Sequence, residues 1–212
     1  MPTKTSTNNR LIGLGVDIGN EAEPIISLAI PYTAKVEITG TVDILFHRWN
    51  CDAVAAKAKA PKGSAAKKTD DIATFVYRDE NGNIGIPGNY LRGAIIGAAK
   101  FRQDPRSSRK SAQDLVKAAI TILTPMASMG IKLWDYEHKC RVLIQRAAIT
   151  RTRPAIKSGW KATFEVLVTL PEYISQPFLQ ELLLDAGRLI GLGDDRPTYG
   201  RFVVSRFKQL TN

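Results

Sequence analysis

The chain has 212 residues, 44% of them hydrophobic and 24% charged, which is ordinary for a globular protein with one core. Its 30 Lys and Arg residues against 20 Asp and Glu residues give a net charge of +10 at pH 7. This excess favours nucleic acid over a membrane as the polyanionic partner. No window of about 20 apolar residues lacks a charge, proline or strongly polar break, which excludes a transmembrane helix. The polar amino terminus does not resemble a secretory signal, so we expect a cytoplasmic protein.

Metal and cofactor chemistry finds little support in the composition. Cys51 and Cys140 lie 89 positions apart, and His47 and His138 do not complete a standard zinc spacing. The paired carboxylates at 70–71 and 194–195 lack a recognisable set of further ligands, so solvated loop charge is the simpler interpretation. We therefore predict no metal, no cofactor and no disulfide framework.

The positive charge is concentrated in three segments. Residues 48–68, 92–110 and 139–161 together hold 19 of the 30 basic residues and only two acidic ones. Each segment alone fits a solvated surface, because runs of like charge usually face water. The three together favour a track that binds phosphate groups.

The first predicted elements are a strand and a loop. Apolar residues alternate with polar ones from 36 to 46, which predicts a long half-buried strand that leads to His47 and Trp49. The Ala- and Lys-rich segment 51–69 contains Pro61 and Gly63, which predicts a mobile basic loop or a passive linker.

Two helices are expected in the middle of the chain. A short strand over 72–77 and a tight turn at Asn81-Gly82 come first. A helix then begins at Asn89 and carries an apolar stripe to residue 101, so its free first-turn N–H groups beside Arg92 form a possible anion site. Ser111 and Asp114 resemble a capping box for a second helix that ends before residue 125.

The remaining elements complete a recognisable order. Strands over 141–149 and 162–170 flank a basic hairpin connection at 150–160, and a helix opens at Ser175 and Pro177. A glycine-rich loop and a last strand over 201–208 follow. The sequence therefore predicts one α+β domain over residues 1–212, with a ferredoxin-like or RRM-like βαββαβ antiparallel sheet and helices on one face. Its insertions are the basic loop 51–69 and a hairpin at about 148–161, and no solenoid repeat is visible.

Two motifs resemble those of one known family. Residues 86–94, IPGNYLRGA, resemble the I-P-G-S-S-L-[KR]-G segment of the RAMP superfamily, which includes backbone subunits of CRISPR RNA-guided effector complexes. Residues 191–202, GLGDDRPTYGRF, resemble its carboxy-terminal glycine-rich loop. The segment 141–170 is similar to the strand, thumb-like hairpin and strand of those subunits, so the resemblance covers about residues 36–208.

Some residues depart from the family pattern. Asn89 and Tyr90 stand where the family has two small hydroxylated residues, and no glycine pair ends the first strand. Asp194 and Asp195 would repel phosphate unless they cap a backbone turn or pair with an arginine. These positions leave the subfamily open.

The resemblance implies an RNA-binding backbone subunit rather than an enzyme. Such a subunit would form a head-to-tail homo-oligomer along a guide RNA, support pairing to a complementary target strand, and contact other effector-complex subunits without a membrane. One alternative is an endoribonuclease that uses His47 as a general base or Asp52 in metal-assisted cleavage. Another is a basic assembly protein that contacts only other proteins.

The candidate RNA-binding residues combine forked donors, lysines and aromatic rings. Glycines beside them would let the main chain approach the sugar-phosphate backbone. The predicted set is His47, Arg48, Lys57, Lys59, Asn89, Arg92, Arg146, Arg151, Arg153, Lys157, Trp160, Lys161, Arg196, Tyr199 and Arg201.

Overall fold

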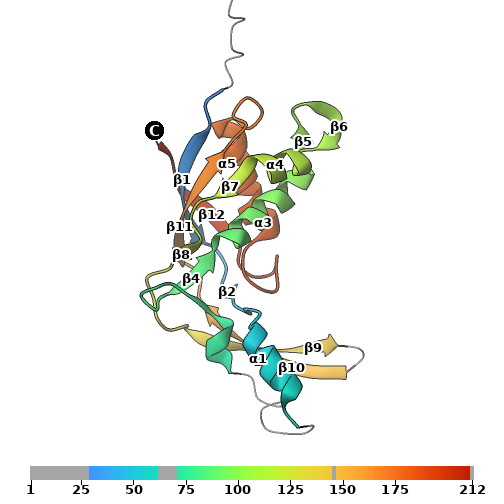
Figure 1. The fold of residues 1–212 in the computed structure, drawn as a ribbon, viewed down its shortest axis with the longest axis vertical. Coiled ribbons are helices and arrows are strands. Elements are labelled where there is room, and N and C mark those ends of the chain that lie inside the picture. The colour runs from blue at the N-terminus through green and yellow to red at the C-terminus, as the bar shows by residue number, and fades with distance from the viewer. Residues whose placement is uncertain (1–28, 62–70, 145–146, 211–212) are drawn as a thin grey trace, which may run out of the picture.

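A computed structural model describes residues 29–61, 71–144 and 147–210 (Figure 1). Its main sheet has four antiparallel strands in the order β12-β1-β11-β7. Every second residue of the first strand is buried, as the two-residue period of a strand requires. The strands are β1 (Tyr32–Gly40), β7 (Ile120–Ile122), β11 (Lys161–Val168) and β12 (Phe202–Leu210).

Three helices lie together on one side of this sheet (Figure 1). They are α3 (Gly88–Ala98), α4 (Gln113–Ala119) and α5 (Gln176–Asp185), and α5 continues as a short π-helix, Ala186–Ile190. Leu91, Ala94, Ile95 and Ala98 form the buried stripe of α3 at helical spacing. The result is a mixed α+β structure with antiparallel sheets, which is consistent with an RRM-like fold.

A second group of elements extends from the base of the main sheet (Figure 1). A three-stranded sheet has the order β2-β10-β9. Its β9–β10 hairpin and helix α1 both project away from α3, α4 and α5. Two smaller sheets have the orders β3-β4-β8 and β5-β6. The bounds are β2 (Ile44–Leu45), α1 (Cys51–Lys59), a 3-10 helix (Ile72–Phe75), β3 (Tyr77–Arg78), β4 (Ile84–Pro87), a 3-10 helix (Ala99–Phe101), β5 (Gln103–Asp104), β6 (Ser107–Ser111), β8 (Met126–Ser128), β9 (Tyr136–Ile144) and β10 (Ala147–Ile156).

One continuous core joins the sheet, the helices and the start of the second group. Ile38 of β1, Phe164 of β11 and Leu91 of α3 are fully buried in it, as is Phe46, just after β2. Each such side chain contributes about 1.5–3 kcal/mol to the free energy of unfolding when it leaves water. The loop that follows Phe46 is therefore fixed to the core at its first residue.

The predicted strand over 36–46 is divided in the structure. It leaves the main sheet at Gly40, and residues 44–45 pair instead with β10. A Cβ on Gly40 would collide with the indole of Trp160, whose carbonyl accepts a hydrogen bond from Gly40 N at 2.7 Å. Alternation continues through the bend because residues on both sides of it face the same core.

Residues 51–59, expected as part of a loop, form helix α1 instead. Ala and Lys are strong helix formers, so the composition read as low complexity also supports a helix. Asn50 Oδ1 accepts a hydrogen bond from Asp52 N at 3.1 Å and caps the first turn. The rest of the expected loop, residues 62–69, lies outside the described residues.

The hairpin also has other bounds than expected. Its strands pair from Ala147 with Ile144 onward, so most of the expected connection 150–160 belongs to β10. Pro154 suggested a loop, yet it lies within β10, where its carbonyl accepts a hydrogen bond from Phe46 N at 3.0 Å. Accepting that bond does not require the N–H that proline lacks.

The two predicted helix caps differ in outcome. Ser175 Oγ accepts a hydrogen bond from Phe178 N at 3.4 Å, which confirms the predicted start of α5. Ser111 belongs to β6, and α4 follows Ala112 without a side-chain cap, so the predicted capping box is wrong. The pairing of β6 with β5 holds Ser111 in an extended conformation that local sequence does not reveal.

Candidate nucleic-acid interface

The loop after β2 presents a histidine and an arginine on a base of aromatic rings. Arg48 N donates a hydrogen bond to Phe75 O at 2.9 Å, and the rings of His47 and Phe75 are in tilted contact with centroids 4.6 Å apart. The guanidinium carbon of Arg48 lies 5.6 Å from the centre of the Tyr77 ring, a cation–π geometry. The loop is thus held in place while the Arg48 side chain remains exposed.

A tyrosine pair connects this loop to helix α3. The rings of Tyr77 and Tyr90 meet edge to face at 5.6 Å, and their hydroxyl oxygens lie 3.2 Å apart. Burial raises the pKa of Tyr90, as does the hydrogen bond with Tyr77, so its phenol stays neutral. The charges of Asp194 and Arg196 also act on Tyr90, which places the glycine-rich loop beside it.

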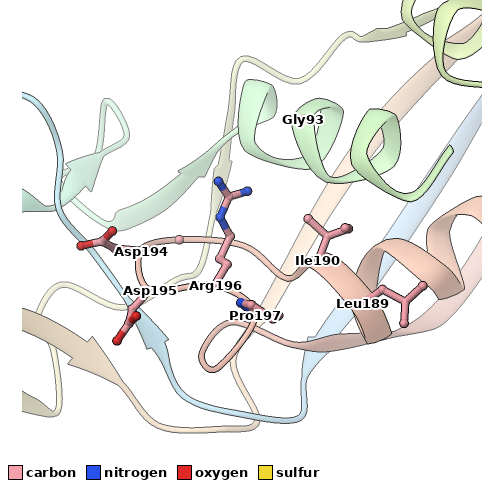
Figure 2. A pocket seen from close by; sticks show the side chains of 8 residues that line it. Gly93, Leu189, Ile190, Asp194, Asp195, Arg196 and Pro197 are labelled. Atoms are coloured by element: carbon pink, nitrogen blue, oxygen red, sulfur yellow. The ribbon is translucent and has the colours of Figure 1, made fainter. Parts of the chain in front are cut away.

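The two motifs of the sequence resemblance meet at an open cleft of about 510 Å³. Gly93 from the first motif and residues 193–197 from the second line it, together with Leu189 and Ile190. In Figure 2 the Arg196 side chain projects from the loop toward α3, while Asp194 and Asp195 point away from that helix. Of these three charged residues, Arg196 is therefore the one whose side chain faces α3, and it is exposed.

The loop depends on backbone conformations that favour glycine. Gly191, Gly193 and Gly200 have φ angles of 76°, 81° and 74°. A Cβ on Gly200 would collide with the carbonyl oxygen of Leu192, so this position also requires the absence of a side chain. Asp195 adopts a φ of 56°, a conformation that Asp tolerates better than most residues.

Arg153 is an internal partner of the loop rather than an exposed cation. It is only 5% exposed, and its Nε lies 2.6 Å from Asp194 Oδ2 while its Nη1 lies 2.8 Å from Cys140 Sγ. This ion pair removes the repulsion that Asp194 would otherwise exert on a phosphate group. Arg153 was expected to contact RNA directly, but its guanidinium is buried and is not available for such a contact.

Other predicted contact residues are also occupied within the fold. Arg92 donates to the carbonyls of Lys117 and Ile120 at 2.6 and 3.2 Å, where α4 ends. Trp160 is 5% exposed, and its indole N–H donates to Val42 O at 2.9 Å, so it is a core residue without a face for a base. Tyr199 places its hydroxyl 3.0 Å from His138 Nε2, and Arg201 Nε donates to Pro197 O at 2.9 Å.

The structure brings four of the predicted residues into one region. His47 lies close enough to Arg151 of β10 for that cation to lower its pKa, although burial is the larger cause. His47 is therefore neutral at physiological pH, and Arg48, Arg151 and Arg196 supply the positive charge. This arrangement can bind phosphate groups through guanidinium forks and offers aromatic rings nearby.

The remaining predicted residues lie apart or outside the description. Lys59 ends α1, Asn89 is the second residue of α3, and Lys157 and Lys161 flank the turn between β10 and β11, all four exposed. The side chain of Lys57 and the whole of Arg146 are outside what the structure describes.

Sequence reasoning missed the aromatic part of the site. Phe75, Tyr77 and Tyr90 were not among the predicted contacts, although Tyr90 lies within the first motif. Asp194 was seen as an obstacle to phosphate binding, and its partner Arg153 lies 41 positions away. Phe75 ends the 3-10 helix Ile72–Phe75 and Tyr77 begins β3, so the strand expected over 72–77 is wrong for its first residues. No two-residue alternation in the sequence could therefore have placed these two rings together.

The described part of the chain has neither a cluster of metal ligands nor a membrane-spanning helix. Residues 29–61, 71–144 and 147–210 contain no group of three or more His, Cys, Asp or Glu side chains that could hold a metal ion. Over the same ranges, no helix has the length and apolar character needed to cross a membrane.

Comparison with known proteins yields likenesses to solved structures alone. No protein-family model matches the chain, and no curated protein matches it. The chain is similar to part of the cryo-EM structure of the Type III-B Cmr-beta bound to cognate target RNA, with 12% sequence identity and a TM-score of 0.49. The likeness covers 86% of this chain and 61% of that chain, so this protein spans less than two thirds of its length. No family membership follows from these comparisons.

Proposed function

We propose that this protein is an RNA-binding backbone subunit of a CRISPR RNA-guided effector complex. It would assemble head to tail along a guide RNA and support the pairing of that RNA with a complementary target strand. The observation that carries the proposal is the meeting of the motifs 86–94 and 191–202 at one cleft lined by Arg196, with a tyrosine pair that joins the first motif to the loop of Arg48.

The charges and rings of the site suit a single-stranded polyanion. Arg48 and Arg196 are exposed and Arg151 is half-buried, while the nearby Asp194 is neutralised by Arg153. Contacts of this kind hold the sugar-phosphate backbone without reading sequence, as a subunit that accepts any guide requires. The β9–β10 hairpin, with exposed Lys139 and Arg141, is the proposed counterpart of the family's thumb.

RNA retention tests the proposal directly. We expect the purified protein to elute from size exclusion as a large particle with a high ratio of absorbance at 260 nm to that at 280 nm. After removal of nucleic acid, it should bind labelled single-stranded RNA at low salt. The double variant Arg48→Ala/Arg196→Ala should bind at least about 10-fold more weakly, because it loses two guanidinium contacts.

A matched control separates this site from net charge. Arg206→Ala/Lys208→Ala removes the same charge from β12, outside the site, and should bind RNA like the wild type. Equal losses in both double variants would refute the site. A monomer that carries no RNA and binds none at low salt would refute the proposed function.

A further inference from the structure

Trp49 stands out from the other tryptophans by its exposure. Its side chain is 68% exposed, whereas Trp160 is 5% exposed and Trp134 is half-buried. Exposing a large apolar ring to water is unfavourable, and indoles of this kind are typical of interaction sites. Trp49 follows Arg48, and Asn50 separates it from the start of α1.

The backbone on both sides of Trp49 is anchored. Phe46 N and Arg48 N donate hydrogen bonds to Pro154 O and Phe75 O at 3.0 and 2.9 Å. On the other side, Val54 N donates to Asn50 O at 3.0 Å in the first turn of α1. The indole is therefore presented from a held loop, which lowers the conformational entropy that binding would cost.

The charges around Trp49 indicate what it would contact. Arg48 precedes it in the same loop, and the charge of Arg151 on β10 acts on the nearby His47. An aromatic face beside guanidinium groups suits an unpaired nucleobase, because the ring stacks on the base while the cations hold the flanking phosphates. A base within a duplex offers no free face to such a ring.

We infer that Trp49 is a stacking platform for an unpaired base of single-stranded RNA. The inference rests on the proposed function and specifies how one nucleotide is held at the same surface. It adds a contact that recognises the base face rather than the phosphate.

Binding of RNA oligomers with and without bases tests this role. We expect Trp49→Ala to weaken binding of single-stranded oligouridine on the order of 10- to 100-fold. Trp49→Phe should retain most of the affinity, since a smaller ring still stacks. Leu133→Ala is the control, because Leu133 is 75% exposed in another loop and should not affect binding.

An abasic ribose-phosphate oligomer of the same length identifies the contact. It should bind the wild type and Trp49→Ala equally, because only the base meets the indole. The slope of the logarithm of affinity against the logarithm of salt concentration should be the same for both proteins, since no phosphate contact is removed.

The possible failures point to different errors. If Trp49→Ala binds oligouridine like the wild type while Arg48→Ala/Arg196→Ala does not, the stacking role is wrong and the proposed function stands. An equal loss for the abasic oligomer would also overturn stacking. A wild-type protein that binds no RNA would overturn both, and Trp49 would then be a contact for another protein.

Discussion

At the residue scale, Arg153 shows how an acidic loop becomes compatible with a nearby phosphate. Its guanidinium is buried and lies 2.6 Å from the partly exposed carboxylate of Asp194. The pair joins β10 to the glycine-rich loop, and Asp194 N also donates to Leu45 O at 2.8 Å. Neutralisation of Asp194 and anchoring of the loop thus depend on the same contact.

We predict that Asp194→Asn lowers the free energy of unfolding by about 2–3 kcal/mol. The change leaves a buried guanidinium without its counter-charge, and the cost falls below the ~3–5 kcal/mol of a fully buried pair because Asp194 is partly exposed. The control is Asp195→Asn, which changes an exposed neighbour. Asparagine tolerates the positive φ of this position, so the substitution should lower the free energy of unfolding by less than about 0.5 kcal/mol. Urea unfolding measures both, and similar losses would contradict the structural role of the pair.

A second residue-scale prediction compares two glycines with nearly equal φ. Gly200 and Gly130 have φ angles of 74° and 72°, but a Cβ would meet the Leu192 carbonyl at Gly200 and nothing within 4 Å at Gly130. Gly130→Ala should therefore cost about 1–2 kcal/mol from the left-handed conformation alone. Gly200→Ala should cost clearly more, because the loop must also move. Thermal unfolding of both variants tests this, and equal costs would contradict the crowding.

At the scale of elements, the β9–β10 hairpin is fixed at its base. β10 pairs with β2, and side-chain contacts add three further links to the body. The links are Tyr136 to Asp43 at 2.6 Å, Arg153 to Asp194 at 2.6 Å and Tyr199 to His138 at 3.0 Å. The hairpin therefore has a defined direction at its root, as a protruding binding element needs.

The Tyr136 link should give this region a dependence on alkaline pH. Burial, followed by the hydrogen bond to Asp43, raises the pKa of Tyr136 to about 12. An unfolded tyrosine ionises near pH 10, so the contribution of Tyr136 is fully present below about pH 10 and is lost as the pH rises toward 12. Tyr136→Phe should lose less stability over that window than the wild type.

Urea unfolding at several pH values between 8 and 11.5 measures this difference. Burial also raises the pKa of Tyr32 and Tyr90, but both are present in the wild type and the variant, so their effect cancels in the comparison. Parallel curves for the wild type and Tyr136→Phe would show that the link does not stabilise the folded state.

At the scale of the whole molecule, the three basic segments do not contribute equally to a surface track. In segment 92–110, Arg102 binds Glu181 and Asp185, and Arg106 binds Asp104. Arg92 is occupied by backbone carbonyls. The six cations of this segment are therefore divided: these three are occupied within the fold, and Lys100, Arg109 and Lys110 remain exposed.

Salt dependence of RNA binding should reveal this distribution. Removing one phosphate contact with Arg196→Ala should reduce the slope of log affinity against log salt by about 0.7, the value for single strands. Lys208→Ala, on β12, should leave the slope unchanged. Fluorescence anisotropy at four or more salt concentrations measures both slopes, and a reduced slope for Lys208→Ala would mean that the track crosses the sheet instead.

Much of the fold could be predicted from local patterns. The alternation in β1, the buried stripe of α3 and the Ser175 cap of α5 depend on neighbours within a few residues, and the structure contains all three. The break after Gly40 could not be predicted in this way, because it depends on Trp160, 120 positions later. The strand β10 was missed because basic residues and Pro154 resemble a loop until β2 and β9 pair with them.

The sequence by itself determined the net charge, the class of most elements and the order of the two motifs. Only the tertiary structure decided which cations face water: Arg196 is exposed, while Arg153 is buried against Asp194. It likewise made Trp160 a core residue and left Trp49 exposed. The reason is that periodicity follows from local backbone geometry, whereas burial and ion pairing depend on segments that are distant in the chain and adjacent only after folding.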